Sequence, residues 1–399
     1  MLTPSDAEAL IRERLACLPI ESLPLAQCAG AVLRENIYAE RDAPPFDRVA
    51  MDGIACAGGP LRQGQREFRV QGAQPAGDPP LTLEAPDCCI EVMTGAMLPA
   101  GCDAVVPIEQ VELAAGRARI TSASPPAAGA NIHRRGADAR QGALLLSAGT
   151  RLGAPESAIA ASAGMARVRV SAQPRIAVIS TGNELVEPGE PIEPWQVRRS
   201  NPYGVVAALR AHAFERVVDD HMPDDAEILA ARLRFHLDTH DVLILSGGVS
   251  MGRLDLVPQT LARLGVEQVF HRIAQRPGKP MWFGTTGAGC AVFALPGNPV
   301  STLVCLARYV IPALGVAMGS AAVAPERLPL AADCEVTTPL TTFLPVRIAH
   351  DDWGRGWAHP QPTNGSGDFM SLAGTHGFIE LPGGPHRFAR GHVSRLFGW

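Results

Sequence analysis

Three short apolar segments in the middle of the chain constrain its fold more than any other feature. They are continuous, rich in β-branched residues, and cover residues 175–180, 241–246 and 290–295. Runs of this kind are typical of strands buried on both faces of a parallel sheet. Helical patterns are predicted between them, at residues 203–213, 225–237 and 257–264. This alternation predicts a doubly wound α/β domain over residues 171–324.

The flanking segments predict a multidomain protein, because 399 residues exceed what one compact core usually holds. Residues 45–137 are rich in Gly and Pro and contain short strand patterns, which predicts an inserted β-rich domain. Residues 1–44 are predicted to pair with residues 138–170 as an N-terminal helix and stalk domain around the insertion. Residues 325–399 show short strands and turns, which predict a small C-terminal β-barrel or sandwich.

The first helix is predicted from a capping pattern at the start of the chain. Ser5 and Glu8 have the spacing of a capping box, in which each side chain bonds to the main chain of the other residue. The apolar residues that follow would then face the interior of the protein. They are Leu10, Ile11 and Leu15.

Composition and charge exclude several classes of function. The formal net charge is -5, so we expect no nucleic-acid partner. The most apolar window, residues 304–324, contains Arg308 and Pro312, which predicts a buried helix and no membrane span. The first residues lack the basic and apolar regions of a secretory signal, and the nine cysteines form no Cys-x-x-Cys pattern. We therefore expect reduced thiols and a cytoplasmic location.

Each of the three predicted strands is followed directly by a glycine-containing loop and a helix. Ligands of open α/β sheets bind beyond the carboxyl ends of the strands. Glycine lets backbone N–H groups approach a ligand, and helix N-termini favour anions, so the three loops predict an anion site. Asn298 and Pro299 also suit the N-cap and the first position of the third helix. The candidate binding residues on these loops are Thr181, Gly182, Ser246, Gly247, Gly248, Ser250, Pro296, Gly297, Asn298 and Ser301.

Carboxylates follow the same strand ends, at Glu184, Asp224 and Asp255. Acidic side chains beside a phosphate usually indicate a bridging divalent cation, most often Mg²⁺, which prefers oxygen ligands. These three residues are therefore candidate metal ligands and catalytic acids. Asp224 and Asp225 have a second explanation, because aspartate directly before a helix pattern caps the helix.

Lys279 is the only lysine among the 35 basic residues. Its ammonium is a compact point charge, whereas the guanidinium of arginine is a broad planar fork, so a tight anion pocket can accept the first and exclude the second. The exception predicts that Lys279 reaches a small, highly charged oxyanion. The alternative is a residue left by chance during a genome-wide drift from lysine to arginine. Elsewhere, Asp52 and Thr94 each stand before a glycine and are ordinary turn residues by physical chemistry alone.

Seven short segments, taken together and in their order, resemble the molybdopterin molybdenumtransferases of the MoeA and gephyrin E-domain type. They are residues 50–53, 93–96, 134–136, 180–185, 246–250, 276–280 and 295–301. The resemblance runs from about residue 5 to the C-terminus. It implies a homodimer with a molybdopterin-binding α/β domain, an inserted β-rich domain, a stalk-like domain and a C-terminal β-barrel. It also implies an active site at the subunit interface.

The resemblance further implies a reaction and its partners. The enzyme would insert molybdate into adenylated molybdopterin, release AMP and depend on Mg²⁺. The adenylating enzyme of the same pathway would be a further partner. Carried over by motif, Glu184, Asp224 and Asp255 surround the phosphate and metal, while the inserted domain contributes Asp52, Thr94 and Asp138. The molybdate site would contain Lys279, Pro280 and Ser301, extended from the C-terminal domain by Arg347 and Ser366, and Arg276 is a further candidate substrate-binding residue.

Two positions depart from the family pattern. Arg276 stands where lysine is usual, and Asn183 stands where aspartate is frequent, which removes one possible cation ligand. Ser371 is an alternative to Ser366. Two other functions are alternatives to molybdate insertion: adenylation of molybdopterin with ATP, and a gephyrin-like non-catalytic scaffold. The additional domains argue against the first, and the missing long linker and extra N-terminal domain against the second. The sequence leaves the choice between molybdate and tungstate open.

Overall fold

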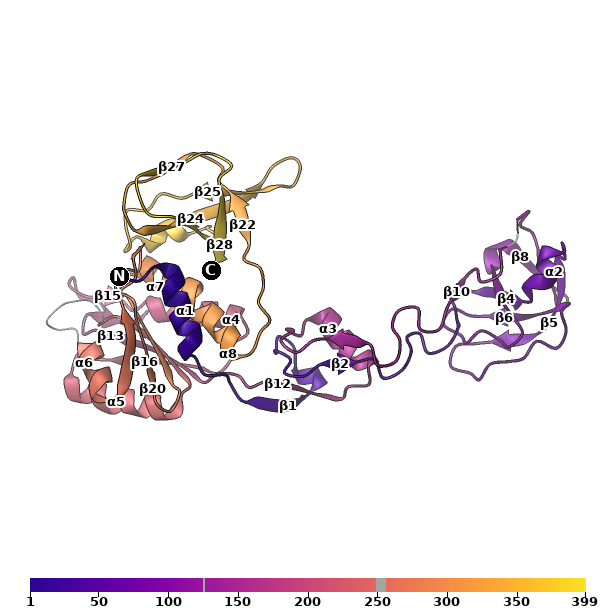
Figure 1. Cartoon of the computed structure of the whole chain (residues 1–399), viewed down its shortest axis with the longest axis horizontal. Coiled ribbons are helices and arrows are strands. Elements are labelled where there is room, and N and C mark those ends of the chain that lie inside the picture. Colours follow the sequence, from indigo (N-terminus) through magenta and orange to yellow (C-terminus); the bar gives the residue numbers. More distant parts are fainter. Residues whose placement is uncertain (125, 249–255) are drawn as a thin grey trace. The chain divides into compact units, whose positions relative to one another are not determined.

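The structure is a computed structural model that describes residues 1–124, 126–248 and 256–399. Ser250 and Asp255, two of the predicted site residues, lie outside these residues. The chain forms two compact units (Figure 1). The larger unit contains Met1–Glu35, Ala148–Gly153 and Arg167–Trp399. The smaller unit contains Asn36–Ser147 and Ala154–Ala166. The finer division into four domains stays a prediction.

A six-stranded sheet forms the centre of the larger unit. In sheet order its strands are β16 (Val217–Met222), β13 (Ile176–Thr181), β17 (Val242–Ser246), β21 (Ala291–Leu295), β20 (Trp282–Thr286) and β18 (Val266–His271). The first four strands are parallel, as the apolar runs predicted. Strand β20 is antiparallel to both of its neighbours, β21 and β18. A short hairpin that contains Gly289, with φ +92°, joins β20 to β21.

Helices cover both faces of this sheet (Figure 1), which confirms the doubly wound fold. Alternate residues of β13 enter opposite cores, with Ile176 and Val178 in one and Ala177 and Ile179 in the other. The three helices predicted between the apolar runs begin and end within two residues of the predicted positions. They are α4 (Asn201–Ala211), α5 (Ala226–Thr239) and α6 (Leu256–Arg263), followed by α7 (Pro299–Cys305), a π-helical turn (Leu306–Val310) and α8 (Ile311–Ala317).

The apolar stretch predicted to be a buried helix is part of this core. Within the described residues, Pro299–Ala317 is the one helix long and apolar enough to cross a membrane, and 72% of its most apolar window is buried inside the protein. Leu306, Val310 and Leu314 belong to the core cluster of one sheet face. The burial of this helix agrees with the prediction, but the predicted stretch extends too far, because residues 320–324 are not helical and Val323 is 89% exposed.

Helix α1 (Pro4–Arg14) begins earlier than its sequence pattern indicated. Thr3 is the N-cap and forms the capping box with Asp6, so the predicted pair of Ser5 and Glu8 is wrong. Pro4 explains the difference, since proline favours the first helical position and requires an extended residue before it. Ile11 is buried as expected, whereas Leu10 and Leu15 are only partly buried.

A second six-stranded sheet in the larger unit is formed mainly by the C-terminal residues. Its order is β19 (Gln275–Arg276), β24 (Thr341–His350), β26 (Gly377–Leu381), β28 (Val393–Gly398) and β22 (Arg327–Pro329), with β25 (Gly356–Pro360) on β24. Strand β19 comes from the α/β region, so this pairing fixes residues 275–276 beside the C-terminal sheet. Three further pairs are β1 (Ile20–Pro24) with β12 (Arg167–Ser171), β14 (Leu185–Val186) with β15 (Val197–Arg198), and β23 (Cys334–Val336) with β27 (His386–Phe388).

The smaller unit is rich in β-structure, as predicted for the insertion. Its main sheet has the order β7 (Ala104–Pro107), β4 (Gly53–Cys56), β6 (Cys88–Val92), β5 (Glu67–Gln74), β9 (Arg117–Ile120) and β8 (Val111–Ala114), beside helix α2 (Gly58–Arg62). The remaining elements are the pair β3 (Arg48–Val49) and β10 (Ile132–His133), the pair β2 (Ile37–Tyr38) and β11 (Leu144–Leu146), and helix α3 (Ala154–Ser162).

Candidate functional site

The three glycine-containing loops meet at one edge of the central sheet, as the sequence predicted. Ser180 of β13 is paired with Ser246 of β17, which in turn is paired with Leu295 of β21. The loops approach each other closely, because a Cβ atom on Gly247 would lie only 2.8 Å from the carbonyl oxygen of Thr181. Gly247 also has φ +100°, so glycine is required there for two reasons.

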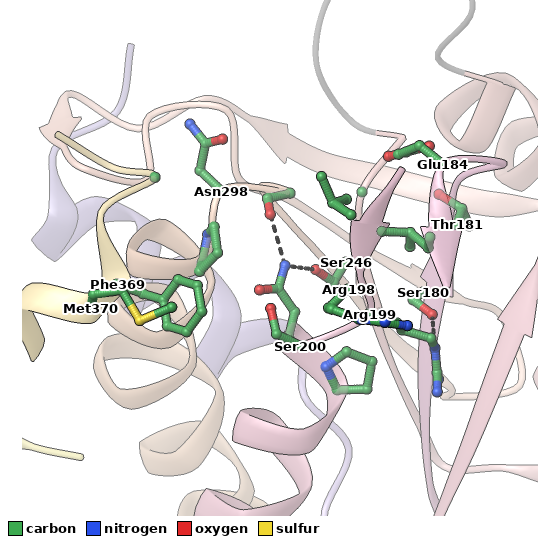
Figure 2. Close-up of a pocket in the computed structure, with 18 residues that line it drawn as sticks. Ser180, Thr181, Glu184, Arg198, Arg199, Ser200, Ser246, Asn298, Phe369 and Met370 are labelled. Atoms are coloured by element: carbon green, nitrogen blue, oxygen red, sulfur yellow. Dashed lines mark hydrogen bonds between the residues drawn. The ribbon is translucent and has the colours of Figure 1, made fainter. Parts of the chain in front are cut away.

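A cavity of about 590 Å³, here the first cavity, opens at this edge (Figure 2). Its lining combines the ends of β13 and β17, the start of α4, residues 297–299, and the segment around Phe369 and Met370. The predicted residues that line it are Thr181, Glu184, Ser246, Gly247, Gly297 and Asn298. Gly182 and Gly248 flank this lining in the same two loops. A Cβ on Gly182 would lie 2.5 Å from the carboxylate of Glu184, so that glycine makes room for the acid.

Asn201, which the sequence did not single out, joins two of the loops. Its Nδ2 donates to Ser246 Oγ at 2.8 Å and to the carbonyl oxygen of Gly297 at 2.7 Å. These partners are 45 and 96 residues away in sequence, so no local pattern indicates them. The first cavity is therefore shaped by a residue that only the folded chain reveals.

Arg199 is a second residue that the sequence did not reveal, and it fixes one wall of the first cavity. Its side chain is 4% exposed. It donates to Ser180 Oγ at 2.5 Å (Figure 2), to Glu187 at 2.6 Å and to both carboxylate oxygens of Asp219. Burial disfavours the charge of Glu187, but the hydrogen bonds from Tyr203 and Arg199 outweigh it and lower the pKa of that carboxyl.

A second cavity, of about 470 Å³, lies where the C-terminal sheet meets the α/β region. It is lined by residues 275–280, by the start of α7, and by residues 340–345 and 363–366. The predicted residues Arg276, Lys279, Pro280, Pro296, Ser301 and Ser366 all belong to this lining. Within the part of the chain that the structure describes, the exposed Lys279 ammonium makes no hydrogen bond or ion pair. It is therefore free to bind an anion.

The two cavities share Asn298, which lines both. Asn298 is the N-cap residue of α7, as predicted, but its side chain makes no capping hydrogen bond to the helix. Its Nδ2 instead donates to Ser366 Oγ at 2.7 Å, and the Val300 amide donates to the Ser366 carbonyl. The alternative residue Ser371 bonds within its own turn to Asp368 and lines neither cavity, so the contacts favour Ser366.

Two predicted site residues are placed differently. Arg347 lies on β24 and donates to the carbonyl oxygen of Ala373, so it lines neither of these cavities. Asp224 is exposed and lines neither cavity, and its main-chain amide donates to Asn183 Oδ1 at 3.1 Å. The capping explanation applies to Asp225 alone, which accepts from two amides of the first turn of α5.

The three predicted acids and hydroxyls of the insertion belong to the smaller unit. Thr94 donates to Asp52 Oδ1 from its amide at 2.6 Å and from its hydroxyl at 2.7 Å. The amide contact is the larger cause of the lowered pKa of Asp52. Asp138 Oδ1 lies 2.8 Å from His133 Nε2 and accepts a hydrogen bond from it when that nitrogen carries the proton. Their predicted place in a cleft with another subunit stays a prediction.

No group of three or more His, Cys, Asp or Glu side chains within the described ranges could hold a metal ion. Glu184 is the predicted metal ligand that lines the first cavity. Mg²⁺ is commonly bound through one or two carboxylates together with substrate phosphates and water. Among the described residues, one carboxylate lines this cavity, which fits that kind of site and does not fit a cage made by the protein alone.

Three regions of the chain match known protein families. Residues 2–164 match the MoeA N-terminal region (domain I and II), residues 177–315 a probable molybdopterin binding domain, and residues 327–393 the MoeA C-terminal region (domain IV).

Whole proteins match as well. The chain is 39% identical over 371 residues to a molybdopterin molybdenumtransferase of Synechocystis sp., covering 93% of each chain. It is 34% identical over 80% of each chain to molybdopterin molybdenumtransferase 2 of Mycobacterium tuberculosis. A solved structure of a molybdopterin biosynthesis MoeA protein from Pyrococcus horikoshii OT3 matches with a TM-score of 0.82 and 26% identity, over 100% of both chains. The chain therefore belongs to the MoeA family of molybdopterin molybdenumtransferases.

Proposed function

We propose that this chain is an enzyme that inserts molybdenum from molybdate into adenylated molybdopterin with release of AMP. The observation that carries the proposal is the pair of cavities that meet at Asn298. The reaction joins a large phosphorylated pterin and a small tetrahedral oxyanion. The first cavity, which lies at the loop ends on a sheet edge, suits the phosphorylated pterin. The smaller second cavity, which contains the one lysine, suits the oxyanion.

In this proposal the residues of the chain bind and orient both substrates. The loop amides beside Thr181 and Gly247 hold the phosphate, and the Lys279 ammonium holds molybdate on the other side of Asn298. The two dithiolene sulfurs then bind molybdenum, one oxygen ligand leaves as water with the two thiol protons, and a second water molecule cleaves the phosphoanhydride bond so that AMP leaves. Bringing the reactants together in a fixed orientation supplies part of the rate enhancement.

Mg²⁺ is part of the proposal and fits the described residues only in part. When bound, it would offset the negative charge of the phosphates. Glu184 would hold it together with oxygen atoms of the substrate and water. Asp224, which is exposed and lies outside the lining of both cavities, is a weaker candidate. The homodimer, the contact with the adenylating enzyme and the cytoplasmic location also belong to the proposal and rest on the family resemblance and on composition.

The test is a calorimetric titration of the full chain with sodium molybdate. Lys279→Ala should weaken binding about tenfold to a hundredfold, because charge-assisted hydrogen bonds contribute roughly 1.5–3 kcal/mol. Lys279→Arg keeps the charge and tests the need for a compact cation. Arg263→Ala, which removes an exposed cation from the end of α6, is the matched control and should leave the affinity unchanged. An unaltered dissociation constant in Lys279→Ala would refute this role.

The two alternative functions are not favoured. Relatives that match 93% of this chain are named molybdopterin molybdenumtransferases, and the match includes regions outside the molybdopterin binding domain. Incubation with ATP and molybdopterin separates the adenylating reaction from the proposed one, since only an adenylating enzyme would transfer AMP to the pterin. AMP release from adenylated molybdopterin on addition of molybdate is the result expected here.

A further inference from the structure

The segment that carries Lys279 rests on a buried polar side chain. Gln275 directly precedes residues 276–280 and is fully buried. Its Nε2 donates to the carbonyl oxygen of Pro277 at 3.1 Å, and its Oε1 accepts from the hydroxyl of Tyr309. Because both ends of the amide have partners, the side chain is held in one orientation, and it holds the main chain two residues before Lys279.

Tyr309 reaches Gln275 from a π-helical turn, Leu306–Val310, between α7 and α8. Turns of this kind are rare, and inside helices they occur frequently at functional sites. Tyr309 is 2% exposed, and burial raises the pKa of its hydroxyl, so the group stays a proton donor. A buried hydroxyl without a partner would cost free energy, and Gln275 is the partner that removes this cost.

Gly278 brings the main chain directly onto this contact. A Cβ atom at Gly278 would lie 2.5 Å from Gln275 Nε2 and 2.6 Å from Cys305 Sγ. The residue also has φ +91°, which other residues rarely adopt. The loop therefore lies on Gln275 and Cys305 without a side chain between them, and any shift of the Gln275 amide is passed to the backbone next to Lys279.

We propose that Tyr309 and Gln275 are positioning residues that fix residues 276–280 from beneath and so set the affinity of Lys279 for molybdate. Neither the Tyr309 hydroxyl nor the Gln275 side-chain amide needs to contact the anion, because both groups act through the loop backbone. The inference rests on the proposed function of the second cavity. It goes beyond that function because it assigns the π-helical turn a role in oxyanion binding.

The experiment is a double-mutant cycle on the full chain with sodium molybdate as the probe. Tyr309→Phe should weaken molybdate binding roughly threefold to tenfold, the effect of losing one hydrogen bond. In the Lys279→Ala background the same change should have little effect, because the loop then has no ammonium to position. Tyr38→Phe, at an exposed residue of β2 in the smaller unit, is the matched control and should leave molybdate affinity unchanged.

A second variant separates positioning from general stability. Tyr309→Phe or Gln275→Leu alone leaves a buried polar group without a partner and should lower the melting temperature. The combined variant replaces both partners by apolar groups and should recover much of that loss. Its molybdate affinity should stay low, since the contact to Pro277 is still missing. Recovery of affinity together with stability would show a merely structural role and overturn the inference.

The outcomes also separate this inference from the proposed function. If Lys279→Ala leaves molybdate binding unchanged, the proposed function of the second cavity fails, and the inference that rests on it fails too. If Lys279→Ala weakens binding while Tyr309→Phe and Gln275→Leu do not, the proposed function stands and the positioning role is wrong. Equal effects of Tyr309→Phe with and without Lys279 would also overturn the positioning role.

Discussion

The first and second cavities meet at Asn298, yet different interactions hold their walls in place. In the first cavity, Arg199 ties the wall to the sheet through a buried guanidinium and two carboxylates. In the second, the wall rests on neutral hydrogen bonds between Tyr309, Gln275 and the loop backbone. The difference follows from what each cavity presents. A neutral support leaves the charge of Lys279 uncompensated, whereas a fully paired arginine adds no free charge beside a large ligand.

The largest effect is expected from breaking the charged support of the first cavity. Arg199→Met removes the charge-assisted hydrogen bonds of a buried guanidinium to Ser180, Glu187 and Asp219 and should lower the free energy of unfolding by about 3 kcal/mol, because one such bond contributes roughly 1.5–3 kcal/mol. AMP binding, as a probe of the first cavity, should be lost, while molybdate binding should persist. Chemical denaturation and calorimetry measure both.

Arg198→Met is the matched control for this prediction. Arg198 is the neighbouring residue, is exposed, and donates only to two carbonyl oxygens of its own loop. Its replacement should change stability by about 0.5 kcal/mol or less. If Arg199→Met and Arg198→Met lowered the free energy of unfolding equally, the buried network would contribute nothing special to the first cavity.

The comparison also shows which parts of the site a sequence can reveal. The strands at residues 176–181 and 242–246 were found because a continuous apolar run is a local signal. Lys279 was found from composition, because it is unique. Asn201 and Arg199 were missed because their partners come from distant strands and loops, and pairing of that kind leaves no periodic pattern.

The C-terminal side shows a similar physical limit of sequence-based prediction. Arg347 was expected at the molybdate site from a weak motif, but its strand pairing places it opposite His359 and its guanidinium reaches Ala373. The register of a strand decides which face a side chain occupies, and a short motif does not encode that register. Ser366 lines the second cavity and Ser371 lines neither cavity, but the role of Ser366 in molybdate binding stays a prediction, and its bond to Asn298 was not foreseen.

A second prediction disturbs the neutral support of the second cavity. Gly278→Ala adds a Cβ against Gln275 and Cys305 at a residue with φ +91°, so stability should fall by about 2 kcal/mol and molybdate binding should weaken. AMP binding should be unchanged. Gly287→Ala is the control, because nothing lies within 4 Å of its added Cβ. A normal molybdate affinity in Gly278→Ala would contradict the close packing of this loop.

A third prediction concerns the residue that belongs to both cavities. Asn298→Ala removes the hydrogen bond to Ser366 and should lower stability by about 1 kcal/mol. AMP and molybdate affinities should both fall several-fold, in contrast to the changes at Arg199 and Gly278, which act on one cavity each. Calorimetry with each ligand checks this. An effect confined to one ligand would mean that the cavities are independent despite their shared residue.

The smallest effect is expected from pH, and only on the charged support. The pKa of Glu187 is lowered, so its ionised form is favoured by folding; this contribution is complete above the ordinary value near 4.5 and is lost as pH falls through the lower folded pKa. Because the Glu187 side chain is 43% exposed, solvent screening limits the contribution to less than about 1 kcal/mol. Denaturation curves of wild type and Glu187→Gln isolate it from other carboxylates. The two proteins should differ at pH 6 and converge as pH falls below the lowered pKa of Glu187, because wild-type Glu187 then carries no charge either. A difference that persists at the lowest pH would mean that Glu187 acts through packing and the Tyr203 contact instead of through its charge.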